Sequence, residues 1–124
     1  QCFGANREKL LKPILQDRSN LCYLLANDHG IAGYCAVSVL EKTAGVGPLI
    51  CRQNLGDAAL PLIQTVLSKL ENHDVFICIP AEENSLLDAL SKVGLQEKFR
   101  VTRMFLGPAA AKGCTYIPES LERG

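Results

Sequence analysis

The chain has 124 residues, of which 48% are hydrophobic and 21% are charged. This composition is typical of a folded globular domain and excludes a disordered chain. Thirteen Lys and Arg balance thirteen Asp and Glu, so we expect neither nucleic acid nor an acidic membrane surface as a partner. No apolar run approaches the roughly 20 residues that cross a bilayer. These numbers predict a single domain over residues 1–124.

An amino-terminal helix is indicated by apolar residues at helical spacing. Leu10, Leu11, Ile14 and Leu15 follow this spacing, and Asn6 can cap the helix before them. Pro13 lies inside this pattern. Because proline lacks the backbone N–H that a helix interior uses, we expect a break or kink there.

Three strands are predicted next. The apolar runs 21–26 and 31–40 flank a turn cluster at residues 27–30 and predict an antiparallel hairpin. The third strand is expected over residues 44–51, which end at Cys51.

The chain then predicts a helix, a strand and a second helix. Apolar residues recur on one face over 58–71, with Pro61 in the first turn, where a missing N–H costs little. Residues 75–79 form a continuous apolar run, the pattern of a strand covered on both faces. A helix that opens near Asn84 is ended by Gly94, which can adopt the left-handed conformation.

A last strand is predicted over residues 98–106, and the tail from Gly107 has no strong pattern. Strand 44–51, helix 58–71 and strand 75–79 form a β-α-β unit, so these two strands should be parallel. The predicted fold class is therefore α/β, with a mixed sheet flanked by helices.

Six cysteines are spread along the chain without any C-x-x-C pair. Neither a zinc ribbon nor a thioredoxin motif is available, and we expect no metal. A free cysteine within an apolar run behaves as a small buried hydrophobe. We therefore expect buried, reduced thiols and a cytoplasmic protein. The cysteines within or at the end of such runs are Cys22, Cys35, Cys51 and Cys78.

The stretch from Gly47 to Ala58 leads from a strand into a helix. Free backbone N–H groups and the helix dipole favour phosphates at such a position. Gly56 and Ala58 would let a diphosphate approach the backbone, and Arg52 can add a positive charge. Asp57 repels phosphate, or it is simply a helix cap.

The order of elements and the segment Q-N-L-G-D-A at residues 53–58 resemble the GNAT superfamily of acetyl-CoA-dependent N-acetyltransferases, whose motif here is Q/R-x-x-G-x-G/A. The C-terminal halves of tandem GNAT proteins, of the bacterial YitH-like type, are more similar still. Their motifs recur in order at residues 3–11 (F-G-x-x-R-x-x-L-L), 33–34 (G-Y), 47–49 (G-P-L), 94–95 (G-F, here G-L) and 102–107 (T-R-M-Y-x-G, here with Phe105).

The resemblance implies a GNAT-like fold, in which two parallel strands splay apart and hold the acyl-thioester arm between them. Strands 44–51 and 75–79 correspond to that pair. Acetyl-CoA is implied as co-substrate, with pantetheine on the third strand, pyrophosphate on the following loop and an asparagine against the CoA arm. The residues implied are Leu49, Ile50, Cys51, Gln53, Asn54, Leu55, Gly56, Asp57, Ala58 and Asn84.

Two departures leave the function open. Many GNAT enzymes place a tyrosine acid four residues before the glycine of G-F, where this chain has Leu90, and Asp57 is atypical. The chain is expected to be an acyl-CoA N-acyltransferase that acts on an unidentified amine. Alternatively it is a degenerate, non-catalytic GNAT module that covers or binds an upstream GNAT half, or a small-molecule binding domain with the same cleft.

The start of the chain also leaves two explanations open. It begins at Gln1 without a signal peptide, which fits a processed secreted protein or a domain excised from a longer chain. Because the first strand of a complete GNAT fold is absent, we expect an excised C-terminal half. A second GNAT domain in the same chain, or a homodimer, is the expected protein partner.

Amine acetylation needs a base for the ammonium and an acid for the leaving thiolate. Glu41 and Asp74 are possible bases, although both are expected to be solvated surface charges. Tyr34 and Tyr116 can replace the missing acid. Cys51 can act as an acyl carrier, but a packing role is expected. No residue is nominated as catalytic.

Overall fold

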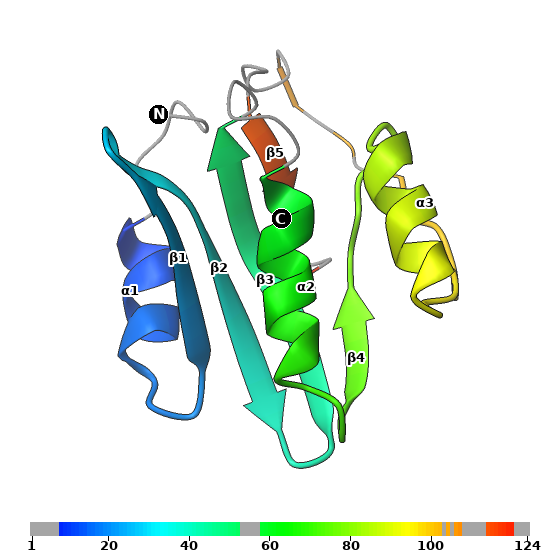
Figure 1. The fold of residues 1–124 in the computed structure, drawn as a ribbon, viewed down its shortest axis with the longest axis horizontal. Helices are drawn as coiled ribbons and strands as arrows, with labels where there is room; N and C mark the ends of the chain where they lie inside the picture. Colours follow the sequence, from blue (N-terminus) through cyan, green and yellow to red (C-terminus); the bar gives the residue numbers. More distant parts are fainter. Residues whose placement is uncertain (1–7, 53–57, 103, 105, 108–113, 121–124) are drawn as a thin grey trace.

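A computed structural model describes residues 8–52, 58–102, 104, 106–107 and 114–120 of the chain. Within this part, five strands form one mixed sheet and three helices lie beside it (Figure 1). The elements in chain order are α1 (Glu8–Gln16), β1 (Leu21–Asn27), β2 (Gly30–Leu40), β3 (Thr43–Arg52), α2 (Ala59–Ser68), β4 (Asp74–Ile77), α3 (Asn84–Lys92) and β5 (Cys114–Ile117).

The predicted hairpin is confirmed. β1 and β2 pair antiparallel from Leu21 opposite Val37 to Asn27 opposite Gly30. The turn is closed by the Asn27 side chain, whose Oδ1 accepts a hydrogen bond of 2.9 Å from the His29 N–H, and by Gly30 at φ 110°. Such side-chain hydrogen bonds and a left-handed glycine are the usual chemistry of a tight turn. The hairpin leaves β1 at the edge of the sheet.

The β-α-β unit is also confirmed. β3 pairs antiparallel with β2, and β3 then pairs parallel with β4, from Thr43 opposite Asp74 to Val46 opposite Ile77. Beyond Val46 and Ile77 the two parallel strands no longer pair within the described residues. The expected divergence of these strands is therefore present.

The strand β5 occupies the edge of β3 that β4 leaves. It pairs antiparallel with β3, from Leu49 opposite Ile117 to Arg52 opposite Cys114. Because β2 holds the other edge of β3 along the same residues, β3 is paired on both sides where it diverges from β4. Figure 1 shows β5 beside the upper end of β3.

The core lies between the sheet and α2. Ile63 and Val66 of α2 are fully buried, as are Val37 of β2, Leu49 of β3 and Ile117 of β5. The helical spacing that predicted α2 is the face that contacts this core, and Pro61 lies in its first turn as expected. Burying these side chains stabilises the fold by about 1.5–3 kcal/mol each.

The last helix ends as the sequence predicts. Gly94 adopts φ 98°, and the following N–H, that of Leu95, donates a 3.1 Å hydrogen bond to the Leu90 carbonyl. A glycine in the left-handed region after the last helical residue satisfies carbonyls that the helix leaves without partners.

Two expectations about strands are wrong. The described residues of 98–106 form no strand, and Phe99 and Val101 are exposed. The last described strand is instead β5, in the tail where no strand was expected.

Two further expectations are corrected. β4 is covered on one face only, since Phe76 remains 57% exposed. Pro13 does not break α1, which continues through it as one short helix. The Pro13 carbonyl oxygen accepts a 3.1 Å hydrogen bond from the Asp17 N–H at the end of the helix.

Candidate active site at the ends of β3 and β4

The residues implied for the pantetheine lie on the last part of β3. Leu49 and Cys51 are buried in the core, and Ile50 is half-buried on the opposite face of the sheet. Their backbone faces β2 on one edge and β5 on the other. A ligand that pairs with β3 here therefore has to take the place of β5.

The residues implied for the pyrophosphate lead into α2. Gln53, Asn54, Leu55, Gly56 and Asp57 lie outside the described residues. Ala58, which precedes the helix, makes no side-chain cap, and the first turn of α2 carries no acidic residue. The first N–H groups of the helix therefore have no side-chain competitor for an anion among the described residues.

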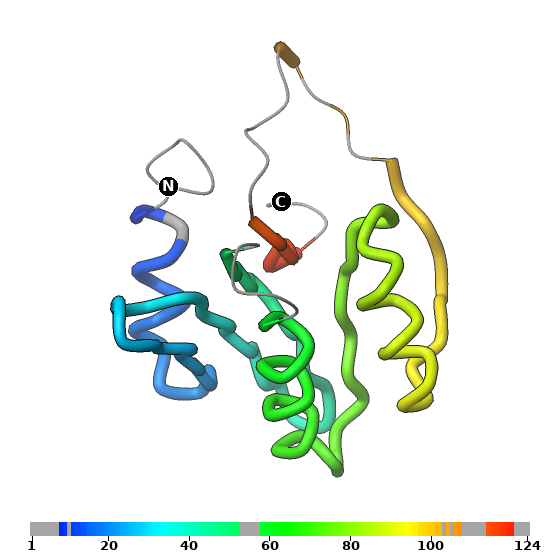
Figure 2. The backbone as a smooth tube through the Cα atoms, turned by 45° about the horizontal axis from the view of Figure 1, so that its top comes forward, coloured from blue at the N-terminus to red at the C-terminus, as the bar shows by residue number. Residues whose placement is uncertain are grey.

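Asn84 is exposed and is the first residue of α3. The preceding Glu83 makes no side-chain cap. Both α2 and α3 begin at the end of the sheet where β3 and β4 finish (Figure 1), and the turned view in Figure 2 shows the same arrangement. In open α/β sheets, ligands bind at this end of parallel strands.

A row of three side chains crosses the sheet beside this position. Ile50 pairs with Tyr34 of β2 on one side and with Tyr116 of β5 on the other. Directly opposed residues of neighbouring strands share a face of the sheet. Both tyrosines considered as acids therefore lie on one face, each next to Ile50, and both are half-buried.

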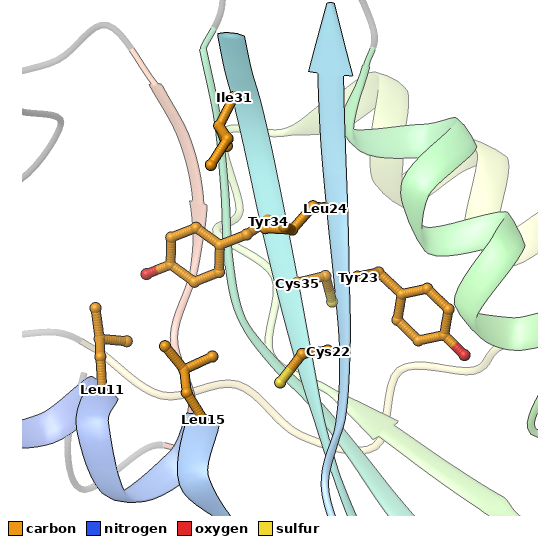
Figure 3. Close-up of a pocket in the computed structure, with 8 residues that line it drawn as sticks. All are labelled: Leu11, Leu15, Cys22, Tyr23, Leu24, Ile31, Tyr34 and Cys35. Atoms are coloured by element: carbon orange, nitrogen blue, oxygen red, sulfur yellow. The ribbon is translucent and has the colours of Figure 1, made fainter.

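An apolar cavity of about 160 Å³ lies on this face, between α1 and the β1–β2 hairpin. In Figure 3 the Tyr34 ring points toward Leu15 of α1, whereas Tyr23 points to the other side of β1. None of the described side chains that line the cavity carries a formal charge. They are Leu11, Leu15, Cys22, Tyr23, Leu24, Ile31, Tyr34 and Cys35.

The two bases considered from the sequence lie at the other end of the sheet. Glu41 and Asp74 are exposed, as expected, and Asp74 begins the parallel ladder opposite Thr43. Seven residues of extended chain separate Thr43 from Ile50, which is roughly 20 Å. Leu90, at the position of the usual acid, is buried in the core.

The cysteines divide by environment. Cys51 is buried, and burial raises the pKa of its thiol, so a packing role fits it and a reactive thiolate does not. Its Sγ fills the space above Gly33, where a Cβ would lie 2.6 Å from the sulfur. Cys35 is buried as well.

The expectation of buried, reduced thiols is wrong at Cys22 and Cys114, and Cys78 is only half-buried. Cys22 is exposed, because β1 is an edge strand, and Cys114 at the start of β5 is disulfide-bonded. The spacing of the cysteines along the chain gave no sign of this bond.

The tail after β5 was not anticipated as part of the site. A Cβ on Gly47 would overlap the Pro118 carbonyl oxygen and would come within 3.2 Å of the Glu119 Cα. Gly47 has φ 149°, a conformation that favours glycine. The G-P-L segment is therefore the surface against which the tail packs.

No helix within the described ranges is long and apolar enough to cross a membrane. In the same part of the chain, His, Cys, Asp and Glu side chains do not form a group of three or more that could hold a metal ion.

Comparison with known families agrees with the geometry. Residues 1–116 match a family model described as an acetyltransferase (GNAT) domain. No curated protein and no solved structure matches the chain. Because the match covers nearly all of the 124 residues, and the mixed sheet with diverging β3 and β4 is consistent with its fold, the chain belongs to the GNAT family of acetyltransferases.

Proposed function

We propose that this protein is an N-acyltransferase that uses an acyl-CoA, with acetyl-CoA preferred, and acts on an amine. The observation that carries this proposal is the N-terminus of α2, where Ala58 makes no side-chain cap, next to the point where β3 and β4 diverge. Backbone N–H groups at a helix N-terminus attract phosphate oxygens. Membership of an acetyltransferase family makes a CoA diphosphate the anion that fits.

Each implied binding residue has a role in this proposal. The first N–H groups of α2, with residues 53–58, hold the pyrophosphate. The backbone of Leu49, Ile50 and Cys51 binds the pantetheine once β5 has left that edge, and Asn84 at the start of α3 contacts the same arm. Acyl-CoA supplies an activated carbonyl, and this chain orients it toward the amine.

Tyr116 is the side chain that we assign as proton donor to the leaving thiolate. It belongs to β5, which pairs with Leu49–Arg52 in the structure, so β5 borders the pantetheine once that arm has taken its place against β3. Tyr34 is on the far side of Ile50, next to the apolar cavity. Leu90 is buried in the core and has no proton to give, so the acid must come from another element.

A non-catalytic module is the second candidate, and one observation favours it. β5 pairs with the same backbone that the pantetheine would use. If β5 stays in place, this edge of β3 does not bind an acyl arm, and the domain instead covers or binds another GNAT domain, in the same chain or in a homodimer.

A calorimetric titration with CoA separates these candidates. The Ala58→Asp variant places a carboxylate at the N-cap of α2. There it should stabilise the helix by about 1 kcal/mol and repel the pyrophosphate. We expect the parent to bind CoA with a micromolar dissociation constant, and this variant to bind at least 10-fold more weakly although it unfolds at a higher temperature.

The matched control is Gln64→Asp, which adds the same charge to an exposed position in the middle of α2. It should leave CoA affinity within about twofold of the parent, because the dipole effect is confined to the first turn. A folded parent that does not bind CoA would support the non-catalytic module. An equal loss of CoA affinity in both variants would show that the pyrophosphate does not bind at the N-terminus of α2.

A further inference from the structure

The cavity between α1 and the β1–β2 hairpin has the size of a small ring. Its volume is about 160 Å³, and an apolar protein cavity of about 150 Å³ holds a benzene molecule. Leu24 and Ile31 line it while remaining 67% and 59% exposed, so a ligand can reach it from solvent.

The side chains that line the cavity determine which chemical groups can bind in it. Leu15 and Leu24 face the cavity from α1 and β1, and the Tyr34 ring closes it from β2 (Figure 3). An ammonium or carboxylate placed among these side chains would lose its hydration without gaining a charged partner, which is costly. A phenyl or branched aliphatic group would bury apolar surface at about 25 cal/mol per Å².

One pair of residues connects the cavity to the proposed acyl-CoA site. Tyr34 lines the cavity and is directly opposite Ile50, whose backbone is assigned to the pantetheine. Opposed residues in an antiparallel pair have Cα atoms about 5 Å apart. A group seated against Tyr34 therefore places an attached short alkyl chain beside the end of β3.

We propose that the cavity is the acceptor subsite, and that the acceptors are primary amines carrying a phenyl-sized apolar group. This inference rests on the proposed acyl-CoA function. In the reaction the amine nitrogen forms a bond to the acyl carbon and the carbon–sulfur bond breaks. The substrate ammonium loses two protons in total, of which one goes to the CoA thiolate and one to solvent.

The test uses the full chain with acetyl-CoA and two amines of different tails. Acetylated product is quantified by mass spectrometry for 2-phenylethylamine and for 1,4-diaminobutane, whose second ammonium cannot enter the cavity favourably. We expect kcat/KM to be at least 10-fold higher for 2-phenylethylamine. Saturation-transfer NMR on the chain without CoA should show that the phenyl ring binds and that the diamine does not.

Two matched variants test whether the preference for 2-phenylethylamine depends on the cavity. Leu24→Ser removes apolar surface from the cavity wall, whereas Leu40→Ser changes an equally exposed strand leucine, 73% against 67%, that does not line it. We expect Leu24→Ser to lower kcat/KM for 2-phenylethylamine about fivefold or more and to weaken the NMR signal, with no change in Leu40→Ser. CoA affinity should be the same in both.

The outcomes separate this inference from the proposed function. If CoA binds and both amines are acetylated equally, the acceptor subsite is wrong and the acyltransferase stands. If CoA does not bind, the acyltransferase fails, and phenyl binding that Leu24→Ser abolishes would still identify the cavity as a ligand site, without its role as an acceptor subsite. Equal effects of the two variants would overturn the cavity assignment.

Discussion

Tyr34 of β2 and Tyr116 of β5 lie on opposite sides of Ile50 in a single row across the sheet. The two residues are 82 positions apart in the sequence, and only the pairing of β5 with β3 brings them to the same face. This row joins the apolar cavity on the α1 side to the edge of β3 that faces β4. The proposed role of Tyr34 follows from its place in this row, whereas Tyr116 acts after the acyl arm has displaced β5 from Ile50.

Tyr116→Phe tests the assigned acid. Loss of a general acid lowers the rate of the chemical step by about 100-fold or more, while a half-buried ring of the same shape preserves packing. We expect kcat for acetyl transfer to fall by that factor, with little change in CoA affinity by calorimetry. The effect should be largest for acetyl-CoA and smaller for a thioester whose leaving thiol is more acidic.

Tyr23→Phe serves as the control, because it removes a hydroxyl from a ring that borders the cavity but points to the other side of β1, away from Tyr34 (Figure 3). It should retain at least half of the parent activity. If Tyr116→Phe has normal kcat and the same dependence on the leaving thiol as the parent, Tyr116 is not the acid.

Gly47→Ala should weaken the packing of the tail at Pro118 and Glu119 against β3. A Cβ at this position overlaps the Pro118 carbonyl oxygen, and φ 149° is unfavourable for alanine. We expect a loss of about 2 kcal/mol in the free energy of unfolding, measured by urea denaturation. Amide hydrogen exchange in β5 should become faster.

Gly45→Ala is the matched control two residues earlier in the same strand. A Cβ there meets nothing within 4 Å, and Gly45 is not in the left-handed region. Its free energy of unfolding should be unchanged or higher by about 0.5 kcal/mol. Equal destabilisation by the two substitutions would contradict the packing of Pro118 on Gly47.

The stability of the chain should fall at alkaline pH partly because of Cys35. Burial raises the pKa of this thiol from its ordinary value of 9.0 to about 12. Above pH 9 the unfolded chain releases the proton that the folded chain keeps, so the stabilisation present below pH 9 is lost between pH 9 and about 12.

A comparison of Cys35→Ala with Cys22→Ala checks this. We expect denaturation curves of Cys35→Ala to depend less steeply on pH above 9, by about one proton. The exposed Cys22 should contribute less, and its variant should retain most of the parent slope. Parallel pH profiles for the parent and Cys35→Ala would show that this thiol does not titrate differently in the two states.

The sequence predicts the elements whose signal is local. The face formed by Leu62, Ile63 and Val66 identifies α2 because each side chain recurs at helical spacing and is buried. The hairpin around Asn27 and Gly30 is found from turn chemistry that acts within four residues. The parallel pairing of β3 with β4 follows from the β-α-β connection, in which the crossover helix returns the chain to the end of the sheet where the first strand began.

Elements that depend on distant pairing are not predicted. β5 has only four residues, and its place is fixed by the edge of β3 that β4 leaves open. Conversely, Phe99 and Val101 belong to an apolar stretch, yet they are exposed and unpaired with a strand. β propensity describes a half-buried surface more than a property of the residues alone, so the pattern predicts a strand that the described structure does not form.

The sequence likewise predicts the local parts of the candidate site but not the parts that several elements form together. The sequence locates the proposed CoA loop between the G-P-L segment and Ala58, because the end of a strand and the start of a helix are local features. The cavity formed by Leu15, Leu24 and Tyr34 needs three elements to meet, and periodicity identifies Leu15 only as one more apolar helix residue.

The central claim is that an acyl-CoA replaces β5 on the edge of β3. Amide hydrogen exchange of the full chain, with and without saturating acetyl-CoA, tests it most directly. We predict slower exchange in the first turn of α2 and, at the same time, faster exchange in Cys114–Ile117 as β5 leaves β3. Unchanged exchange in both segments would contradict the claim, and protection of α2 with β5 still paired would show that the acyl arm does not use this edge.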